Sequence, residues 1–326
     1  SVILVARSGQ RTGLPVEYPF HSPRILRAES WNIRFAFFLL LFGMLLLLPV
    51  QAVVSAPVLP PLNSTNTGQQ ITGKFTWFEL ASIDIEKHKL FYGDVFDWTF
   101  KTMSTSDDQY TLIRNNGKNI AGLFNVEPRD NSKRGGLWIG LMSVADPAAA
   151  VKRVEAGGGK VHTPPRLLVK RGTYALFHDP EGAIFGVLKS SSGDPVEAGV
   201  NTGEFLWMDL FTKDLSRAGE FYQQLAGYKV TTSEATKDKI RLILSSFDKP
   251  RAGIVPLSDG ANRAGWLPYI KVENIAATLK KVEAAGGYVL VTPDKDILDG
   301  NLAIFTDPLG GIMGIVKWVE ATSENK

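Results

Sequence analysis

The stretch from 75 to 80 has the character of a strand, and the spacing of apolar residues after it changes to a helical period. In FTWFEL every second residue falls on the same side of a strand, which places Trp77 and Glu79 on one face. Asp84 is a suitable helix N-cap, and Ile85, His88, Phe91/Tyr92 and Val95 follow at helical spacing, which predicts a helix. Two short strands and the hairpin turn between them complete the unit, at 110–114, 120–124 and 115–117.

A second unit of the same kind follows directly. It opens with an apolar strand at 138–144, and Asp146-Pro147 then starts a helix that the glycines at 157–159 end. Two further strands, near 167–170 and 174–177, lead to a DPEG turn and a last strand. Residues 73–190 therefore predict the order βαβββ twice, with one helix on one face of a curved sheet and the other face lining a cleft.

The whole pattern then occurs again. FTWFELASID is answered by FLWMDLFTKD, KRVEAGGG by KKVEAAGG, and FHDPEGAIFGVLK by FTDPLGGIMGIVK. Repeats of this length are whole domains rather than solenoid units. The sequence therefore predicts an α+β protein of two tandem domains, each a pair of βαβββ modules around a cavity. The predicted boundaries are a first domain at 73–190, a linker at 191–202, a second domain at 203–320 and a tail at 321–326.

The N-terminal region has the features of an export signal. Arg24, Arg27 and Arg34 precede an apolar run at 35–54, and small residues at signal-peptidase spacing follow it. We expect a leader at 1–56 with cleavage after Ala52, a linker at 57–72 and a periplasmic or secreted protein. The alternative is an uncleaved membrane anchor, since about 20 apolar residues can span a bilayer. This segment is the only contact with a membrane that we expect.

Composition excludes several classes of function. The net charge of +3 comes from residues 1–63, which hold five arginines and two acids; the rest has 31 basic and 31 acidic residues. A chain without a basic field is not expected to bind nucleic acid. The chain has no cysteine, which excludes disulfides, thiol nucleophiles and thiolate metal ligands.

The four modules, the Asp-capped FY helix, the helix that ends in EAGG and the DPEG or DPLG turn resemble the vicinal oxygen chelate superfamily. This group contains glyoxalase I, bleomycin-resistance proteins and extradiol dioxygenases. The resemblance implies one cavity in each domain. In metal-binding members the first and last strand of each module supply His, Gln or Glu ligands. The matching positions here are Trp77, Ile139, Trp207 and Leu267 on first strands, and Gly122, Gly186, Gly253 and Gly314 on last strands.

None of these eight side chains can donate a lone pair to a metal, so we expect neither a metal nor a cofactor. A tryptophan wall that faces glycine gaps predicts a pocket for a flat apolar or aromatic ligand. The alternative is that the two tryptophans fill cavities that have become core.

Glu79 and Asp209 lie two residues after these tryptophans and face the same way. Each is a candidate for a structural carboxylate paired with Arg114 or Lys271, for ligand recognition, or for a general base. The histidines are expected to have structural roles at most: His88 on the inner side of its helix, His178 beside the DPEG turn, and His162 in a loop without a role. Asp179 and Asp307 are expected to shape their turns.

Two functions follow from these observations. The first is an exported, metal-free and monomeric protein whose tandem domains bind a small, largely apolar or aromatic molecule in one or two cavities, as bleomycin-resistance proteins do. The alternative is a glyoxalase-like lyase or a dioxygenase, which uses either metal ligands at other positions or Glu79 and Asp209 as general bases.

Overall fold

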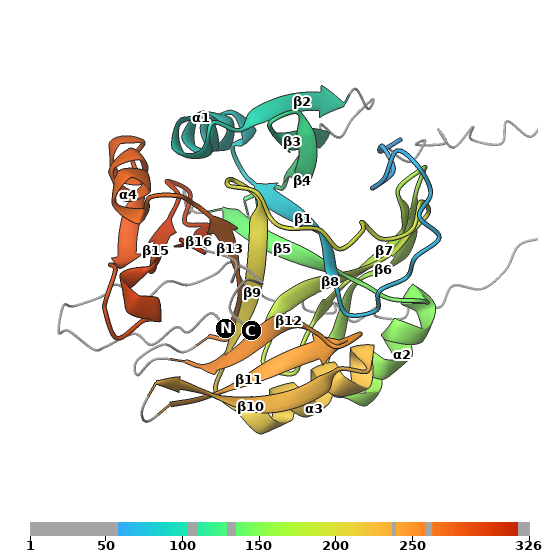
Figure 1. Ribbon diagram of the computed structural model, residues 1–326. Helices are drawn as coiled ribbons and strands as arrows, with labels where there is room; N and C mark the ends of the chain where they lie inside the picture. The colour runs from blue at the N-terminus through green and yellow to red at the C-terminus, as the bar shows by residue number, and fades with distance from the viewer. Residues whose placement is uncertain (1–57, 104–109, 129–134, 237–238, 258–262, 319–326) are drawn as a thin grey trace, which may run out of the picture.

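The computed structural model describes residues 58–103, 110–128, 135–236, 239–257 and 263–318 (Figure 1). The predicted export signal at 35–54 lies outside these ranges. Within them, no helix has both the length and the apolar character that crossing a bilayer requires.

The described elements follow the order βαβββ four times, as predicted. The first repeat consists of β1 (Phe75–Ser82), α1 (Ile85–Phe96), β2 (Thr99–Met103), β3 (Tyr110–Asn115), β4 (Lys118–Asn125), β5 (Gly136–Ser143), α2 (Pro147–Ala156), β6 (Lys160–Leu168), β7 (Gly172–His178) and β8 (Ile184–Ser190). The second consists of β9 (Phe205–Thr212), α3 (Leu215–Ala226), β10 (Lys229–Thr236), β11 (Lys239–Ser246), β12 (Lys249–Pro256), β13 (Gly265–Lys271), α4 (Ile275–Ala284), β14 (Tyr288–Val291), a short 3-10 helix η1 (Leu298–Gly300), β15 (Leu302–Thr306) and β16 (Ile312–Val316).

Each repeat folds into its own eight-stranded sheet. The first has the order β2-β3-β4-β1-β5-β8-β7-β6, and the second repeats it as β10-β11-β12-β9-β13-β16-β15-β14. In each repeat the first strands of the two modules, such as β1 and β5, pair antiparallel at the centre of the sheet. Each of them also pairs in parallel with the last strand of its own module. The predicted α+β fold of two tandem domains is therefore confirmed.

The helix starts follow from their capping residues. The side chain of Asp84 accepts a hydrogen bond from the Lys87 amide at 3.0 Å, and Asp214 caps α3 through the Arg217 amide at the same distance. Each cap satisfies an amide that the first turn of a helix leaves without a partner.

The prediction for His162 was wrong, because it lies in strand β6 and not in a loop. β6 is an edge strand, and its pairing with β7 shifts register between Thr163 and Arg166. Pro164 and Pro165 lie inside this irregular stretch, where an edge strand tolerates residues that cannot donate to the ladder.

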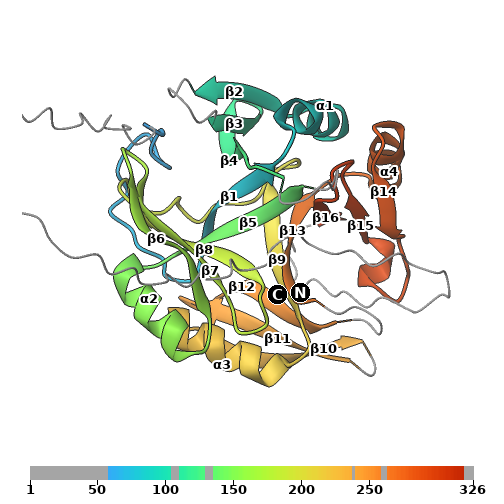
Figure 2. The same cartoon turned by 180° about the vertical axis from the view of Figure 1, so that it is seen from behind.

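The two sheets pack back to back, and the main hydrophobic core lies between them. Phe78 of β1 stacks on Phe205 of β9 with ring centroids 3.8 Å apart, and Phe75 contacts the edge of Trp266 at 5.3 Å. Helix α1 lies beside α4 and α2 beside α3, so each helix pair joins the two repeats (Figures 1 and 2). Trp77 and Trp207 lie on the faces of β1 and β9 that point away from this core. They belong to two separate hydrophobic clusters, one inside the concave face of each sheet.

The aspartates of the two DP turns act across this interface. Asp307 accepts hydrogen bonds from the amides of its own turn through Oδ1, and through Oδ2 from the Tyr92 hydroxyl at 2.9 Å. Asp307 Oδ2 is also 3.0 Å from His88 Nε2, and Asp179 mirrors the arrangement by accepting from the Tyr222 hydroxyl at 3.1 Å. The predicted turn role is confirmed, and each turn also holds the first helix of the other repeat.

The first residues that the structure describes pack against the first domain, although the sequence predicted a linker at 57–72. Val58 forms a parallel bridge with Val169, and the Leu59 amide donates to the Val169 carbonyl at 3.1 Å. Asn63 donates from its side chain to the Gly193 carbonyl at 2.8 Å. We call residues 58–63 the strap.

Candidate binding site in the first domain

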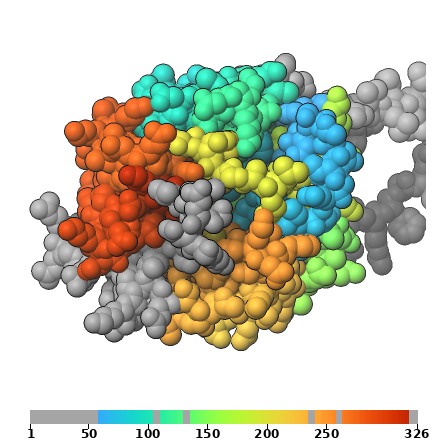
Figure 3. All heavy atoms as spheres, in the orientation of Figure 1, coloured from blue at the N-terminus to red at the C-terminus, as the bar shows by residue number. Residues whose placement is uncertain are grey.

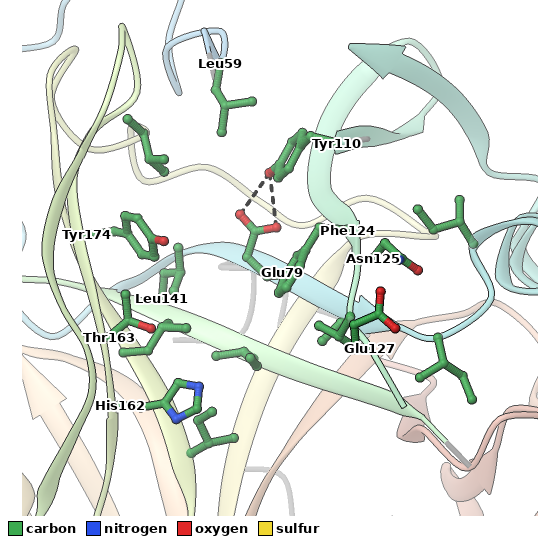
Figure 4. Close-up of a pocket in the computed structure, with 18 of the residues that line it drawn as sticks. Leu59, Glu79, Tyr110, Phe124, Asn125, Glu127, Leu141, His162, Thr163 and Tyr174 are labelled. Atoms are coloured by element: carbon green, nitrogen blue, oxygen red, sulfur yellow. Dashed lines mark hydrogen bonds between the residues drawn. The ribbon is translucent and has the colours of Figure 1, made fainter. Parts of the chain in front are cut away.

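The concave face of the first sheet lines a half-open cavity of about 970 Å³ (Figure 4). Its wall is mostly apolar and aromatic, with side chains from β1, β3, β4, β5, β6, β7 and β8, from the start of α1 and from the strap; exposed polar residues, among them Glu86 and Glu127, also line it. Of the predicted site residues, Glu79 and Ile139 line it. Tyr110, His162 and Tyr174 also line it, although the sequence had not singled out any of them as a site residue.

Glu79 is held by two aromatic donors. The Trp77 indole donates to Oε1 at 2.9 Å, and the Tyr110 hydroxyl lies 2.8 Å from Oε1 and 3.1 Å from Oε2. Only 8% of Glu79 is exposed. A carboxyl fixed by neighbours in this way presents a defined acceptor to a ligand instead of a mobile one.

Burial raises the pKa of Glu79 from its usual 4.5 to about 7. Desolvation is the dominant cause, because a buried site disfavours the charged carboxylate. The nearby Arg171 charge and the hydrogen bonds from Tyr110 and Trp77 act in the opposite direction but do not cancel it. Near neutral pH this carboxyl can therefore donate a proton to a ligand or accept one from it.

The cation whose charge acts on Glu79 comes from an unexpected part of the chain. Arg171, in the turn between β6 and β7, lies over the Trp77 ring at 3.9 Å from its centroid and is 2% exposed. The predicted partner, Arg114, was wrong, because its guanidinium binds the Gly117 carbonyl in its own hairpin at 2.5 Å. Because adjacent residues on a strand face opposite sides, the sequence indicates which face a side chain is on. It does not show which distant loop covers that face, so it did not point to Arg171.

The glycine gaps predicted opposite Trp77 are present, but the chain's own side chains fill them. A Cβ on Gly122 would collide with the Tyr110 hydroxyl and with Glu79, and one on Gly186 would collide with Leu141. Trp77 is 4% exposed and packs in the cluster that contains Leu112 and Leu188. The open volume of the cavity lies beside Glu79, so Trp77 supports that carboxyl from the side that faces away from the open volume.

The second domain places different side chains at the matching positions. Gly122 pairs with Leu112 and Gly253 pairs with Ile243, so the residue two positions earlier is Tyr110 in the first domain and Arg241 in the second. In the same way, Leu141 opposite Gly186 corresponds to Tyr269 opposite Gly314.

These exchanges fill the interior around Asp209. Arg241 Nη2 lies 3.2 Å from Asp209 Oδ1, both side chains are fully buried, and the Trp207 indole donates to the same oxygen at 2.8 Å. Burial raises the pKa of Asp209, against the opposing effect of Arg241. The predicted partner, Lys271, was wrong, since its ammonium binds the Val200 carbonyl at 2.7 Å. Leu267 belongs to the hydrophobic cluster of this interior.

The donor set does not fit the divalent ion of the superfamily's metal-binding members. The Trp77 indole and the Tyr110 hydroxyl bind Glu79, and the other carboxylates that line the cavity, Asp84, Glu86 and Glu127, come from the start of α1 and from the segment after β4. In the part of the chain that the structure describes, no three His, Cys, Asp or Glu residues are grouped closely enough to hold a metal. Stable sites for such ions use three or four N, O or S ligands.

Comparison with known proteins assigns the fold to a family. Residues 74–187 and 204–313 match the model of the Glyoxalase/Bleomycin resistance protein/Dioxygenase superfamily. Since these segments cover more than half of the chain, the protein belongs to this superfamily, as the resemblance had indicated.

Particular relatives share both repeats. The chain is 26% identical over 249 residues to the putative glyoxylase CFP32 of Mycobacterium tuberculosis (strain CDC 1551 / Oshkosh), which covers 75% of this chain and 95% of that protein. It is 28% identical over 262 residues to the anthracycline biosynthesis protein DauV of Streptomyces sp. (strain C5), covering 76% and 94%.

Solved structures show the same fold at low identity. The 2,3-dioxygenase LapB from Pseudomonas sp. KL28 superposes with a TM-score of 0.52 at 11% identity, over 79% of this chain and 96% of that one. The Mn(II)-bound glyoxalase from Novosphingobium aromaticivorans gives 0.51 at 14% identity, over 76% and 83%.

Proposed function

We propose that the first domain binds a small, largely apolar or aromatic molecule in its cavity, with Glu79 as the group that recognises a polar atom of the ligand. The observation that carries this proposal is a buried, titratable carboxyl at the wall of a mainly apolar cavity. A volume of about 970 Å³ is at the upper end of the usual range for small-molecule sites.

The residues of the cavity wall fit a ligand that has an apolar body and one polar group. Ile139, Leu141 and Ile184 offer contact area, and Phe124 and Tyr174 offer aromatic surfaces. Glu79 can accept a hydrogen bond from a ligand amine or hydroxyl when it is ionised, and donate one when it is protonated. The second domain, with its interior occupied by the Asp209–Arg241 pair, supports the first.

A second candidate function is catalysis with Glu79 as a general base. The observation that favours it is the pKa of about 7, because a base is most effective when its pKa lies near the working pH. The similar proteins named glyoxylase support this candidate as strongly as they support binding. The reaction would then be of the lyase or oxidoreductase type.

We further propose that the protein acts outside the cytoplasm as a monomer, released after Ala52 by removal of the leader. Its N-terminus would then be Val53, five residues before the strap. N-terminal sequencing of protein recovered from the exported fraction tests this: a start near Val53 is expected, and an intact leader would support the membrane anchor.

The binding test compares matched variants in the two domains. A panel of apolar, aromatic and polycyclic aromatic compounds is titrated by calorimetry against the wild-type protein, Glu79→Gln and Asp209→Asn. Polycyclic aromatics are included because some relatives are named for anthracycline biosynthesis. We expect Glu79→Gln to weaken binding at least about tenfold, as the loss of a hydrogen bond to a charged group does, and Asp209→Asn to leave it unchanged.

Two results would contradict this proposal. One is that no compound binds the wild-type protein, and the other is that both variants affect binding equally. Turnover separates the candidates: if a bound compound is converted by the wild-type protein and only bound by Glu79→Gln, the carboxyl is a general base.

A further inference from the structure

The strap is part of the wall of the cavity. Leu59 is 1% exposed and lines the cavity, next to Tyr110 at one end of it (Figure 4). Its side chain packs in the same cluster as Trp77, Leu112 and Leu141. The segment that covers this end is therefore the beginning of the described chain and not an element of either sheet.

The strap is held by single contacts along its length and is not a strand of either sheet. Leu59 and Leu62 pack in the apolar cluster, Val58 and Leu59 pair with Val169, the Pro60 carbonyl accepts a hydrogen bond from Arg171, and Asn63 bonds residues 192 and 193. Val58 itself is 49% exposed. Figure 3 shows the blue segment that begins with the strap on the molecular surface. A short segment outside the sheets can open locally at a far smaller free-energy cost than a whole domain unfolds.

The strap also fixes the cation beside Glu79. Arg171 Nε donates to the Pro60 carbonyl at 2.7 Å, whereas both terminal nitrogens are buried without a hydrogen-bond partner in the described part of the chain. The guanidinium is thus positioned by one strap carbonyl and by stacking on Trp77. If the strap moves, the Arg171 guanidinium loses its only described hydrogen bond, and this guanidinium lies on the indole that supports the carboxyl.

The second domain shows how this partner can be supplied without a strap. Leu176 and Ile304 pair with the equivalent Gly186 and Gly314, and five residues before them stand Arg171 and Asp299. The guanidinium beside Asp209 comes instead from Arg241, which is fixed within strand β11. Only the first domain has its cation on a loop held by the N-terminal strap.

We propose that the strap is a movable cover of the Tyr110 end of the first cavity, and that residues 58–63 open this end to ligand when they lift from the β6–β7 turn and release Arg171. This inference rests on the proposed function in one respect, namely that the cavity holds a ligand. The position of the strap just after the predicted leader means that an uncleaved leader would be joined directly to the cover.

Access to the cavity can be measured without a ligand, because the chain has no cysteine of its own. Ile139→Cys introduces a single thiol at the cavity wall, and Leu267→Cys introduces one at the matching position of the second domain; these residues are 3% and 5% exposed. The rate of reaction with 5,5′-dithiobis(2-nitrobenzoate) is measured for each in protein that begins at Val53. The measurement is repeated with Leu59→Ala, with Arg171→Met and in protein that begins at Ser64.

We expect Leu59→Ala and the Ser64 start to raise the rate at position 139 about tenfold or more, and Arg171→Met to raise it less. The rate at position 267 stays unchanged in all three. If truncation prevents folding, Leu59→Ala decides the matter alone. The proposal is overturned if the rate at 139 does not respond, if both rates rise together, or if 139 already reacts as fast as an exposed thiol. The rates can follow the strap even if no panel compound binds, so a failure of the proposed function is distinguishable.

Discussion

The protonation of Glu79 has a consequence for stability that can be measured without knowing the ligand. The pKa of Glu79 is about 7 in the folded protein and takes its usual value of 4.5 in the unfolded chain. The folded state therefore binds the proton more tightly. The stabilising effect is complete below pH 4.5 and is lost as the pH rises through 7. Over the whole range it amounts to about 3 kcal/mol.

Between pH 5 and pH 8 the expected loss is about 2.5 kcal/mol. The assay is urea unfolding at pH 5, 6, 7 and 8, followed by tryptophan fluorescence, for the wild-type protein and for Glu79→Gln. The variant lacks this titration but keeps all others, including that of Asp179, whose pKa burial raises to about 6. The difference in unfolding free energy between the two proteins isolates Glu79.

We expect this difference to shift against the wild-type protein by about 2.5 kcal/mol from pH 5 to pH 8, with most of the change below pH 7. A difference that stays constant within about 0.5 kcal/mol would show that Glu79 is ionised throughout, and the reasoning from burial would be refuted. A change of the opposite sign would mean that Arg171 outweighs desolvation.

Two further predictions concern packing in the two interiors. Gly122→Ala inserts a methyl group against Glu79 and the Tyr110 hydroxyl, and it should lower the free energy of unfolding in urea by about 1–3 kcal/mol. The control is Gly265→Ala, whose new methyl group meets nothing within 4 Å and whose stability should stay within about 0.5 kcal/mol of the wild-type protein. Equal effects of the two variants would contradict the packing described. Arg241→Met leaves Asp209 as an unpaired buried charge and should lower the free energy of unfolding by about 3–5 kcal/mol at pH 8. Adding Asp209→Leu to this variant should recover most of the lost stability. A double variant no more stable than the single one would contradict the pairing.

The sequence predicted the fold well, because local signals agreed with one another. Asp84 and Asp146 start helices where capping chemistry placed them, and the repeat showed that the same elements occur twice. The inward direction of Glu79 also followed from the period of two along β1. These features depend on residues close together in the chain or on comparison between the copies.

The partners of the buried acids could not be predicted in the same way. Arg241 gave a signal, since an arginine in the apolar strand KIRLIL is unusual, and the period of that strand sets which way it faces. Arg171 gave none, because it lies in a turn and reaches Trp77 only through the folded sheet. The cavity itself depends on side-chain volumes: the glycines indicated space, and Tyr110 and Leu141 took it.

The crossed contacts of the DP turns mean that each repeat completes the other. Asp307 of one half and the Tyr92 hydroxyl of the other would lose this partner if either half stood alone, so the chain is in effect a two-fold dimer made from a single polypeptide. A dimer of identical chains must keep two identical interiors. Joining the halves removes that constraint, and it allows Tyr110 beside an open cavity in one half and Arg241 in a filled interior in the other.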